Sequence, residues 1–246
     1  MTGVLVVTGG SRGIGAAVCR LAADRGYDVV VNYAADSTAA QDVVGGLTNV
    51  RAVAVAGDVS DADDVTRLFD AAASLGPLAG LVNNAGITGN TPGRLDEHDP
   101  EVVRRVLDVN VTGVFLCARE AVRRMSTRYG GQGGAIVNVS STAAHRGSPG
   151  EWVPYAASKA AVETMTLGLA KEVAAEGIRV NAVAPGLVHT DLHAAAGMPD
   201  RPDRIAPMIP MRRAGQPDEI AEGIVWLLSP AASFVTGAVL PISGGF

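Results

Sequence analysis

Short, β-branched apolar runs alternate with helical patterns along this chain, and that alternation limits the folds open to it. The apolar runs predict strands at residues 4–7, 29–31, 52–56, 81–82, 135–139, 179–183 and 238–240. Between them, apolar residues spaced three or four apart predict helices at 13–25, 37–47, 62–73, 100–125, 155–175 and 217–228. Strands that are apolar throughout are typical of parallel sheets covered on both faces. We therefore expect an α/β fold, a doubly wound parallel sheet of seven strands with helices on both faces.

The sequence indicates a single domain. We find no repeat, no linker rich in Ser, Pro or Gly and no shift in composition among its 246 residues, so one domain is expected over residues 1–246. Residues 189–211 carry four prolines and few periodic apolar residues, which indicates a substrate loop or lid.

Composition excludes several classes of protein. Hydrophobic residues make up 48% and charged residues 18%, which indicates a packed globular protein. The net charge of -5 and the lack of a basic patch argue against nucleic-acid binding. No apolar run reaches the roughly 18 residues of a membrane span, and no basic segment precedes the first strand, so neither a membrane protein nor a signal peptide is expected. Cys19 and Cys117 lie in apolar helical patterns, which suits small core residues in the reducing cytoplasm.

A glycine-rich turn joins the first predicted strand to the first predicted helix. Its sequence is Thr8-Gly9-Gly10-Ser11-Arg12-Gly13-Ile14-Gly15. At such a junction, backbone N–H groups and the positive end of the helix bind phosphates, and glycines let a phosphate approach closely. The turn predicts a dinucleotide site formed by Gly9, Ser11, Arg12, Gly13, Ile14 and Gly15. A structural turn without a ligand is the alternative.

A tyrosine and a lysine stand four residues apart in an alanine-rich helical stretch. Tyr155 and Lys159 therefore share one helix face, with Cβ atoms roughly 5–6 Å apart. A neighbouring positive charge favours the phenolate and lowers the pKa of a tyrosine from about 10. Lowering that pKa to about 7 requires about 4 kcal/mol, which one lysine and a cationic cofactor in a water-poor site can supply. The two residues are a candidate acid/base pair, and a surface pair without function is the alternative.

Four motifs in a fixed order point to one family. They are Gly9-x3-Gly13-x-Gly15, Asn83-Asn84-Ala85-Gly86, Tyr155-x3-Lys159 and Pro185-Gly186. Together they cover nearly the whole chain and resemble the short-chain dehydrogenase/reductase family, in particular its bacterial 3-oxoacyl-carrier-protein reductase and glucose dehydrogenase branches. The resemblance implies a Rossmann fold that binds NAD or NADP and transfers a hydride to or from a carbonyl/alcohol pair.

The resemblance also implies which residues contact the cofactor. Beyond the glycine turn they are Asn32, Tyr33, Asp58, Val59, Asn83, Ala85, Gly86, Tyr155, Lys159, Pro185, Gly186, Val188 and Thr190. An acidic residue after the second strand usually holds the ribose of NAD, whereas NADP carries a 2′-phosphate there. No carboxylate precedes Asp36 in this corner, and Arg12 is placed to meet a phosphate, so NADP is favoured and NAD is the alternative. Arg12 as a solvated loop residue, and Asp58 as part of the N-cap region of the next helix, are the other interpretations.

By the same resemblance, Tyr155 is the general acid in reduction and the general base in oxidation, while Lys159 lowers its pKa and bonds the nicotinamide ribose. Ser141 binds the substrate oxygen. Asn110 holds a relay water against Lys159, or is a buried polar residue that kinks its helix, or both. The family usually spaces serine and tyrosine by thirteen residues, whereas Ser141 lies fourteen before Tyr155 and Thr142 occupies the usual register. We favour Ser141 and expect a one-residue insertion within residues 150–154.

The segment before Tyr155 supplies candidates for substrate binding. Glu151 and Trp152 stand beside the expected pocket, and a carboxylate next to an indole can bind and stack on a sugar or polyol ring. A loop aromatic can instead pack on its own core or on a neighbouring subunit. Further candidates for the pocket are His145, Arg146, His189 and His193. The histidines lack metal-ligand spacing, so no metal site is expected.

These features predict an NADP-dependent carbonyl reductase or alcohol dehydrogenase with a small, polar, sugar- or polyol-like substrate. A 3-oxoacyl-carrier-protein reductase is the alternative. Arg123, Arg124 and Arg128 are candidates for a carrier-binding patch, but Glu176 stands where such enzymes often have an arginine. A cofactor-sensing binding protein is the non-enzyme alternative, and the presence of both Tyr155 and Lys159 argues against it.

The resemblance further implies an assembly, a homotetramer or a homodimer. The helix at 100–125, the helix that carries Tyr155 and the C-terminal strand are the expected interfaces, and residues 243–246 are placed to pack across one of them.

Overall fold

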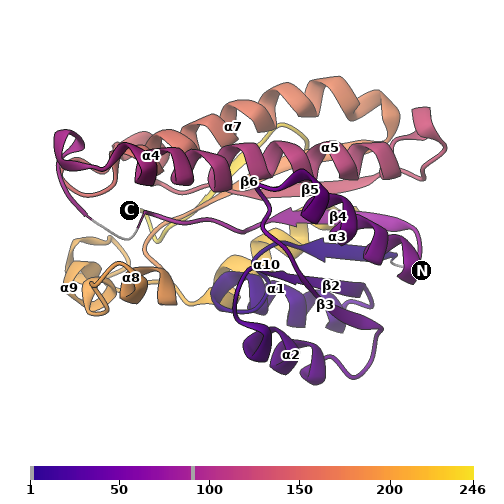
Figure 1. The fold of residues 1–246 in the computed structure, drawn as a ribbon, viewed down its shortest axis with the longest axis horizontal. Coiled ribbons are helices and arrows are strands. Elements are labelled where there is room, and N and C mark those ends of the chain that lie inside the picture. Colours follow the sequence, from indigo (N-terminus) through magenta and orange to yellow (C-terminus); the bar gives the residue numbers. More distant parts are fainter. Residues whose placement is uncertain (1–2, 90–91) are drawn as a thin grey trace.

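Seven parallel strands form one sheet in the computed structural model, which describes residues 3–89 and 92–246 (Figure 1). The strands stand in the order β3-β2-β1-β4-β5-β6-β7. Their bounds are β1 Val4–Val7, β2 Asp28–Tyr33, β3 Ala52–Ala56, β4 Leu78–Asn83, β5 Gly134–Val139, β6 Ile178–Pro185 and β7 Val239–Ile242. This order confirms the predicted doubly wound α/β sheet, a Rossmann fold.

Helices cover both faces of the sheet, as Figure 1 shows. One face carries α1 (Gly13–Asp24), α2 (Ser37–Gly46) and α10 (Pro217–Leu228), and the other carries α3 (Ala62–Leu75), α4 (Pro100–Leu107), α5 (Gly113–Met125) and α7 (Val153–Val173). Strand β1 shows why its residues are all apolar. Leu5 and Val7 pack into the first layer, and Val4 and Val6 into the second, because successive strand residues point to opposite faces.

Short helical segments complete the chain. They are α6 (Ala143–Arg146), α8 (Asp191–Ala195) and α9 (Arg201–Ile205), with the 3₁₀ turns η1 (Leu95–Glu97), η3 (Thr127–Tyr129), η4 (Ala174–Glu176), η5 (Ala206–Met208) and η6 (Pro230–Ala232). Apart from Ala174 and Ala175 of η4, which belong to the predicted helix 155–175, none of these was predicted, because helices of one or two turns are too short to show a period. In the part of the chain that the structure describes, no helix combines the length and the apolar character that a membrane crossing requires.

Several strands are longer than their apolar runs predicted. β4 begins at Leu78 and not at Leu81, and β2 continues to Tyr33, which pairs with Ala56 of β3. Backbone pairing extends a strand wherever its neighbour continues, and this pairing leaves no trace in the local pattern of side chains.

The predicted helix over 100–125 is interrupted at Asn110. A π-helical turn, η2 (Asp108–Thr112), joins α4 to α5, and Asn110 within it is fully buried. Such turns insert an extra residue into a helix and are frequent at functional sites.

The sheet brings the glycine turn and the Asn83–Gly86 segment together. β1 has β2 on one side and β4 on the other, so the chain reverses its direction of winding at this point. Ligands of open α/β sheets bind outside the carboxyl ends of the strands at such a reversal. The hydroxyl oxygen of Thr8, at the end of β1, accepts hydrogen bonds from the backbone N–H groups of Asn84 at 3.0 Å and Ala85 at 3.1 Å.

Candidate active site

A cavity of about 780 Å³ opens along the carboxyl ends of the strands. The glycine turn after β1 lines one part of it, followed by the loops after β2, β3 and β4. The ends of β5 and β6, the start of α7 and the α8–α9 segment line the rest. The cavity therefore joins the predicted phosphate site to the predicted catalytic residues.

The glycine turn has the backbone conformation that its glycines permit. Gly9 and Gly13 have φ values of +60° and +52°, in the left-handed region where other residues are strained. Gly9, Ser11, Arg12, Gly13 and Ile14 all line the cavity, and the first turn of α1 holds no acidic residue to oppose an anion. Gly15 lies behind them. A Cβ at this position would lie 2.2 Å from the carbonyl oxygen of Gly9, so Gly15 allows the turn to close on the helix.

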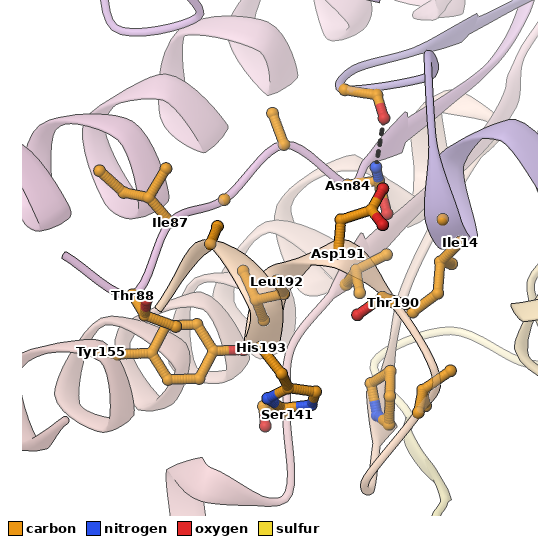
Figure 2. A pocket seen from close by; sticks show the side chains of 18 of the residues that line it. Ile14, Asn84, Ile87, Thr88, Ser141, Tyr155, Thr190, Asp191, Leu192 and His193 are labelled. Carbon is orange, nitrogen blue, oxygen red and sulfur yellow. Dashed lines mark hydrogen bonds between the residues drawn. The ribbon is translucent and has the colours of Figure 1, made fainter. Parts of the chain in front are cut away.

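Asn84 holds the glycine turn in place, and Asn83 does not. The side-chain amide of Asn84 donates hydrogen bonds to the carbonyl oxygens of Thr8 and Gly9, both at 2.9 Å. Figure 2 shows this amide beside the turn. Asn83 is buried within β4, where its amide donates to Asn138 of β5 at 2.9 Å. The side chain of Asn83 therefore faces away from the cavity, and Asn84 borders the glycine turn instead. A contact between Asn83 and the cofactor stays a prediction.

The corner after β2 contains polar groups and one carboxylate, that of Asp36, which also lines the cavity. Asn32 is buried, accepts from the backbone N–H of Gly9 at 3.2 Å and donates to the carbonyl of Gly57 at 3.0 Å. Tyr33 lines the cavity next to it. The carboxylate of Asp36 caps α2, where it accepts from the N–H of Ala39 at 2.9 Å. This corner and the exposed Arg12 thus border the same end of the cavity.

Asp58 and Val59 line the cavity after β3, as predicted. Partial burial raises the pKa of Asp58, but hydrogen bonds from Ser60 and Arg105 outweigh it, so the pKa lies below its usual value. Arg105 Nη2 lies 2.6 Å from the Asp58 carboxylate. The N-cap of α3 is Asp61, so Asp58 is not needed for capping.

These residues fit a nicotinamide dinucleotide. The glycine turn offers the pyrophosphate a helix N-terminus without an acidic side chain in its first turn, and Asp58 and Val59 line the cavity where the resemblance places the adenine. Pro185, Gly186, Val188 and Thr190 line the cavity after β6, where the resemblance places the nicotinamide. At Gly86 a Cβ would lie 3.3 Å from both Lys159 Nζ and Asn110 Oδ1, so glycine keeps this wall of the cavity open.

Tyr155 and Ser141 lie at the other part of the cavity. Tyr155 is in the first turn of α7, Ser141 follows β5, and both side chains are seen beside His193 in Figure 2. Burial raises the pKa of Tyr155, and the Ser141 hydroxyl and the charge of Arg201 lower it, with a net rise. We expected a lowered pKa from Lys159, whose ammonium lies 5.6 Å from the centroid of the Tyr155 ring. In the protein without a bound cofactor, burial raises the pKa of Tyr155 by more than Ser141 and Arg201 lower it.

Ser141 and Thr142 differ in their contacts, and the catalytic role of Ser141 stays a prediction. The backbone N–H of Thr142 donates to the carbonyl of Pro185 at 3.0 Å, which places Thr142 at the start of α6. Both residues line the cavity, but Ser141 is the one whose hydroxyl interacts with Tyr155.

Lys159 is buried, with 4% of its surface exposed. Its ammonium donates to the carbonyl oxygen of Val139 at 2.7 Å, and burial lowers its pKa to about 8. Asn110 does not line the cavity, but it fixes one of its walls. Its side chain accepts from the N–H of Ile87 and donates to the carbonyl of Ile87, both at 2.8 Å, and donates to Ser158 at 3.0 Å. This buried amide joins η2 to the loop after β4 and to α7.

The substrate candidates divide into two groups. Glu151, Trp152 and Arg146 line the cavity, as does His193. His145 does not, because its side chain is exposed and its Nε2 lies 2.9 Å from the buried carboxylate of Glu163. His189 also lies outside the lining, with Nε2 at 3.9 Å from Asp203. Neither histidine lines the cavity, and a role for His145 or His189 in substrate binding stays a prediction.

Many residues that line the cavity were not predicted as site residues, and four of them carry polar or aromatic side chains that bear on binding. These four are Asn84, Arg105, Arg201 and Phe246. Asn84 carried a sequence signal, because it belongs to the Asn83-Asn84-Ala85-Gly86 motif, but the sequence does not distinguish its side chain from that of Asn83. Arg201 had no sequence signal, because the segment that carries it is irregular. It bonds Glu151 across 50 positions of the chain, which only the folded structure brings together.

Comparison with known proteins agrees with this geometry. A family model described as enoyl-(acyl carrier protein) reductase matches residues 9–246. An Escherichia coli protein named uncharacterized oxidoreductase YgfF is 52% identical over 98% of this chain and 99% of its own. The cis-4-hydroxycyclohexanecarboxylate dehydrogenase of Sinomonas cyclohexanicum is 45% identical, over 99% and 96%. A 3-oxoacyl-[acyl-carrier-protein] reductase of Synechocystis is 41% identical, over 98% and 96%.

Solved structures agree as well. A short-chain dehydrogenase from Burkholderia cenocepacia, crystallised in complex with NADP, is 34% identical, with a TM-score of 0.91 over 100% of this chain and 98% of its own. The family match, the relatives and the shared architecture all extend over nearly the full length. This chain is therefore a member of the short-chain dehydrogenase/reductase family of oxidoreductases.

Proposed function

We propose that this protein transfers a hydride between NADP(H) and the carbonyl/alcohol pair of a small, polar, sugar- or polyol-like substrate. The observation that carries the proposal is one cavity with the glycine turn at one end and Tyr155 and Ser141 at the other. Activity assays with a panel of aldoses, polyols, cyclic ketones and 3-oxoacyl thioesters test the proposal. The absorbance of the reduced nicotinamide measures the reaction. Turnover of the thioesters alone would contradict the proposed substrate class.

The roles of the residues follow from their positions. Hydride transfer is the chemistry that a bound nicotinamide would supply in this cavity. Tyr155 donates its phenolic proton to the substrate oxygen in reduction and takes it back in oxidation. Ser141 donates a hydrogen bond to the same oxygen while negative charge develops on it. Lys159 bonds the nicotinamide ribose and, as a cation, favours the Tyr155 phenolate. Asn110 keeps the loop after β4 in place, and a relay water between it and Lys159 is part of the proposal.

A preference for NADP over NAD is supported by charge. The exposed guanidinium of Arg12 borders the cavity beside Tyr33, and the nearby Asp36 is engaged as a helix cap. The Burkholderia relative was crystallised with NADP. We expect Arg12→Ala to lower kcat/KM for NADPH by about tenfold, because one charge-assisted contact is lost. The kcat/KM for NADH should not change. Arg25→Ala, an exposed arginine just after the same helix, is the control. A wild type that prefers NADH would contradict the assignment.

Residues 189–211 are proposed to form a lid over the substrate. This segment contains α8, α9 and η5, and its residues Thr190, His193 and Arg201 line the cavity. The pair Arg201–Glu151 connects it to the loop before α7. Limited proteolysis with and without NADPH and substrate tests this, because a lid is expected to become protected when both are bound.

The alternative activity is reduction of a 3-oxoacyl group on a carrier protein, which the name of the Synechocystis relative favours. The three candidate arginines for the carrier are engaged within the chain. Arg124 bonds Asp70, and it shares Glu120 with Arg123. Arg128 lies 4.0 Å from Glu176. A higher kcat/KM for a carrier-bound 3-oxoacyl group than for the same group on a small thiol would establish this alternative.

The non-enzyme alternative is a protein that binds NADP without turnover. Tyr155→Phe separates the two, because it removes the proton donor and leaves the ring. We expect this variant to bind NADPH like the wild type and to lose at least about a hundredfold in kcat. A wild type without turnover on any compound of the panel, despite binding of NADPH, would favour the sensor.

A homotetramer is the proposed assembly, with a homodimer as the alternative. Phe115 of α5 and Leu167 of α7 are exposed by 52% and 45%, and they belong to helices on one face of the sheet. Trp226 of α10 and Phe234 before β7 are exposed by 42% and 103% on other elements. Exposed large apolar side chains on elements at both faces of the sheet are compatible with more than one interface. Sedimentation equilibrium of the wild type and of Leu167→Asp tests this, and a stable wild-type monomer would contradict it.

We also propose the cytoplasm as the compartment. Cys19 and Cys117 are free and buried on different helices, and burial raises the pKa of both thiols to about 12. Both behave as small core residues, as predicted. Fluorescent tagging of the full chain in cells tests the location.

A further inference from the structure

The part of the cavity beyond Tyr155 is built from two segments that meet only in the fold. Glu151 and Trp152 belong to the loop that leads into α7, whereas His193 and Arg201 belong to α8 and α9. Arg201 Nη2 lies 2.6 Å from one oxygen of Glu151, and its Nε lies 3.4 Å from the other. The guanidinium carbon of Arg201 lies 5.2 Å from the centroid of the Trp152 ring. These four residues form what we call the distal subsite.

The charge of the distal subsite is balanced. The side chain of Arg201 is exposed by only 14% and that of Glu151 by 31%, so the ion pair is largely shielded from water. A ligand carboxylate in this position would have to replace Glu151 at Arg201 or lie beside a second negative charge. Either step costs free energy, because breaking a buried pair leaves one charge without its partner. The pair therefore disfavours anionic substrates.

Two buried polar atoms of the distal subsite have no hydrogen-bond partner. Trp152 is 3% exposed and His193 is 8% exposed. Within residues 3–89 and 92–246, neither Trp152 Nε1 nor His193 Nδ1 has an acceptor or donor in range. Buried polar atoms are nearly always paired in proteins, by other residues, by water or by a ligand. Both residues line the cavity, so a ligand bound there lies next to their side chains.

The chemistry of the two groups restricts what they bind. An indole N–H only donates, so the partner of Trp152 is an acceptor, which for this substrate class is an oxygen. Burial and the charge of Arg201 hold the pKa of His193 at about 4, so its imidazole is neutral near pH 7. A neutral imidazole has one donor and one acceptor nitrogen and pairs with a hydroxyl or a carbonyl oxygen. It brings no positive charge to attract an anion.

We infer that Trp152 and His193 bind an uncharged oxygen, a hydroxyl or a carbonyl, on the non-reacting part of the substrate, and that Glu151 disfavours anionic substrates by neutralising Arg201. The inference rests on the proposed function, since it assumes that the reacting carbon of that substrate lies at Tyr155. It deepens the proposal by assigning substrate selection to four residues of this chain.

Binding without turnover is the first test. Calorimetry measures the affinity of the NADPH-saturated wild type for cyclohexanol, for the separate isomers of the cyclohexanediols, and for 4-hydroxycyclohexanecarboxylate. None of these alcohols reacts with the reduced cofactor. We expect the best diol to bind about tenfold more tightly than cyclohexanol, the gain from pairing one buried donor, and the carboxylate to bind less tightly than that diol. A diol that binds no better than cyclohexanol, or a carboxylate that binds best, overturns the inference.

Variants assign the effect to residues. Trp152→Phe removes the N–H and keeps most of the ring, so the advantage of the diol should fall about tenfold while cyclohexanol is unaffected. Glu151→Gln frees the charge of Arg201, so binding of the carboxylate should tighten by at least about tenfold. Glu101→Gln, which breaks the exposed pair with Arg104 on α4, is the control for loss of a carboxylate. Equal effects of Trp152→Phe on the binding of all three ligands overturn the inference. If a variant fails to fold, the comparison of the three ligands on the wild type still decides whether the inference holds.

Turnover separates this inference from the proposed function. The corresponding ketones are cyclohexanone, the hydroxycyclohexanones and 4-oxocyclohexanecarboxylate, each with NADPH. If none is reduced but the diol binds as expected, the proposed reaction fails and the distal subsite stands. If they are reduced with equal kcat/KM and the diol shows no advantage in binding, the reaction stands and the inference fails.

Discussion

The ammonium of Lys159 lies 2.7 Å from the backbone oxygen of Val139, and this hydrogen bond joins α7 to the end of β5. Val139 stands two residues before Ser141, and Lys159 stands one helical turn after Tyr155. The same bond therefore holds the strand that leads to one candidate catalytic residue against the helix that carries another. Because Lys159 is buried, keeping its ammonium group charged costs free energy in the folded protein.

The stability of the protein should depend on pH through Lys159. Its pKa is about 8 in the folded protein and near the ordinary 10.5 in the unfolded chain. Between these values the unfolded chain binds more protons, so the free energy of unfolding rises with pH by up to about 3 kcal/mol. Below pH 8 both states are protonated and the cost of burying the charge is constant. Urea unfolding from about pH 7 to about pH 10.5 measures the effect.

Lys159→Met is the reference for this measurement, because methionine does not titrate. We expect the wild type to gain stability relative to this variant as pH rises through the window. A difference between the two proteins that is independent of pH would contradict the burial of the Lys159 ammonium.

Ser141 and Thr142 should differ sharply on substitution. We expect Ser141→Ala to lower kcat by about a hundredfold or more, as the loss of one donor to a developing oxyanion does elsewhere. Thr142→Ala should lower kcat by less than about threefold, since the role of Thr142 in the structure is a backbone bond to Pro185. Steady-state kinetics of both variants with one substrate decide the matter. Equal losses would move the catalytic role to Thr142.

Gly15 and Gly45 offer a matched pair of helical glycines. A Cβ at Gly15 would lie 2.2 Å from the Gly9 oxygen and 2.6 Å from the Asn84 amide, so Gly15→Ala should displace the glycine turn. We expect weaker NADPH binding by at least about tenfold and a loss of about 1–3 kcal/mol in stability, the usual cost of overpacking. Gly45 in α2 is exposed with no atom within 4 Å, so Gly45→Ala should stabilise by about 0.5–1 kcal/mol.

Calorimetry of NADPH binding and urea unfolding check both glycine variants. Two alanine variants with the same stability and the same affinity for NADPH would show that the close approach of Gly15 to the turn is not required.

Asn110 should matter for stability and catalysis together. Asn110→Leu keeps the volume but leaves the N–H and the carbonyl of Ile87 without their partners. Leaving such buried groups unpaired costs about 1–3 kcal/mol each, so we expect a loss of at least about 2 kcal/mol. We also expect a lower kcat, because the loop after β4 borders the cavity at Gly86 and Ile87. Asn110→Asp, which retains the acceptor for the N–H, should restore part of the stability. A stable and fully active Asn110→Leu would contradict this role.

The fold was predictable because burial on both faces leaves a direct pattern in the sequence. The strand at 52–56 and the helix at 217–228 have the predicted bounds. Strand ends and short helices were not predictable. Tyr33 and Leu78 belong to strands because a neighbouring backbone pairs with them, which has no counterpart in local side-chain pattern.

The sequence does not determine in which direction the side chains at the site point. Asn83 and Asn84 are adjacent and chemically identical, and only the pleat of β4 sends one into the sheet and the other toward the glycine turn. His145 stands four residues after Ser141 but turns to Glu163, a residue of α7. Spacing alone cannot distinguish such neighbours, because a helix or a strand end decides which way each one points.

The sequence by itself determined the alternation of strands and helices, the glycine turn at a strand-to-helix junction, and the pairing of Tyr155 with Lys159, because each depends on residues that are near one another in the chain. Only the tertiary structure decided that burial sets the pKa of both residues, and that Arg201 meets Glu151 and Trp152 beside them. Burial and long-range contact depend on how elements pack. Neither is encoded in any local window of residues.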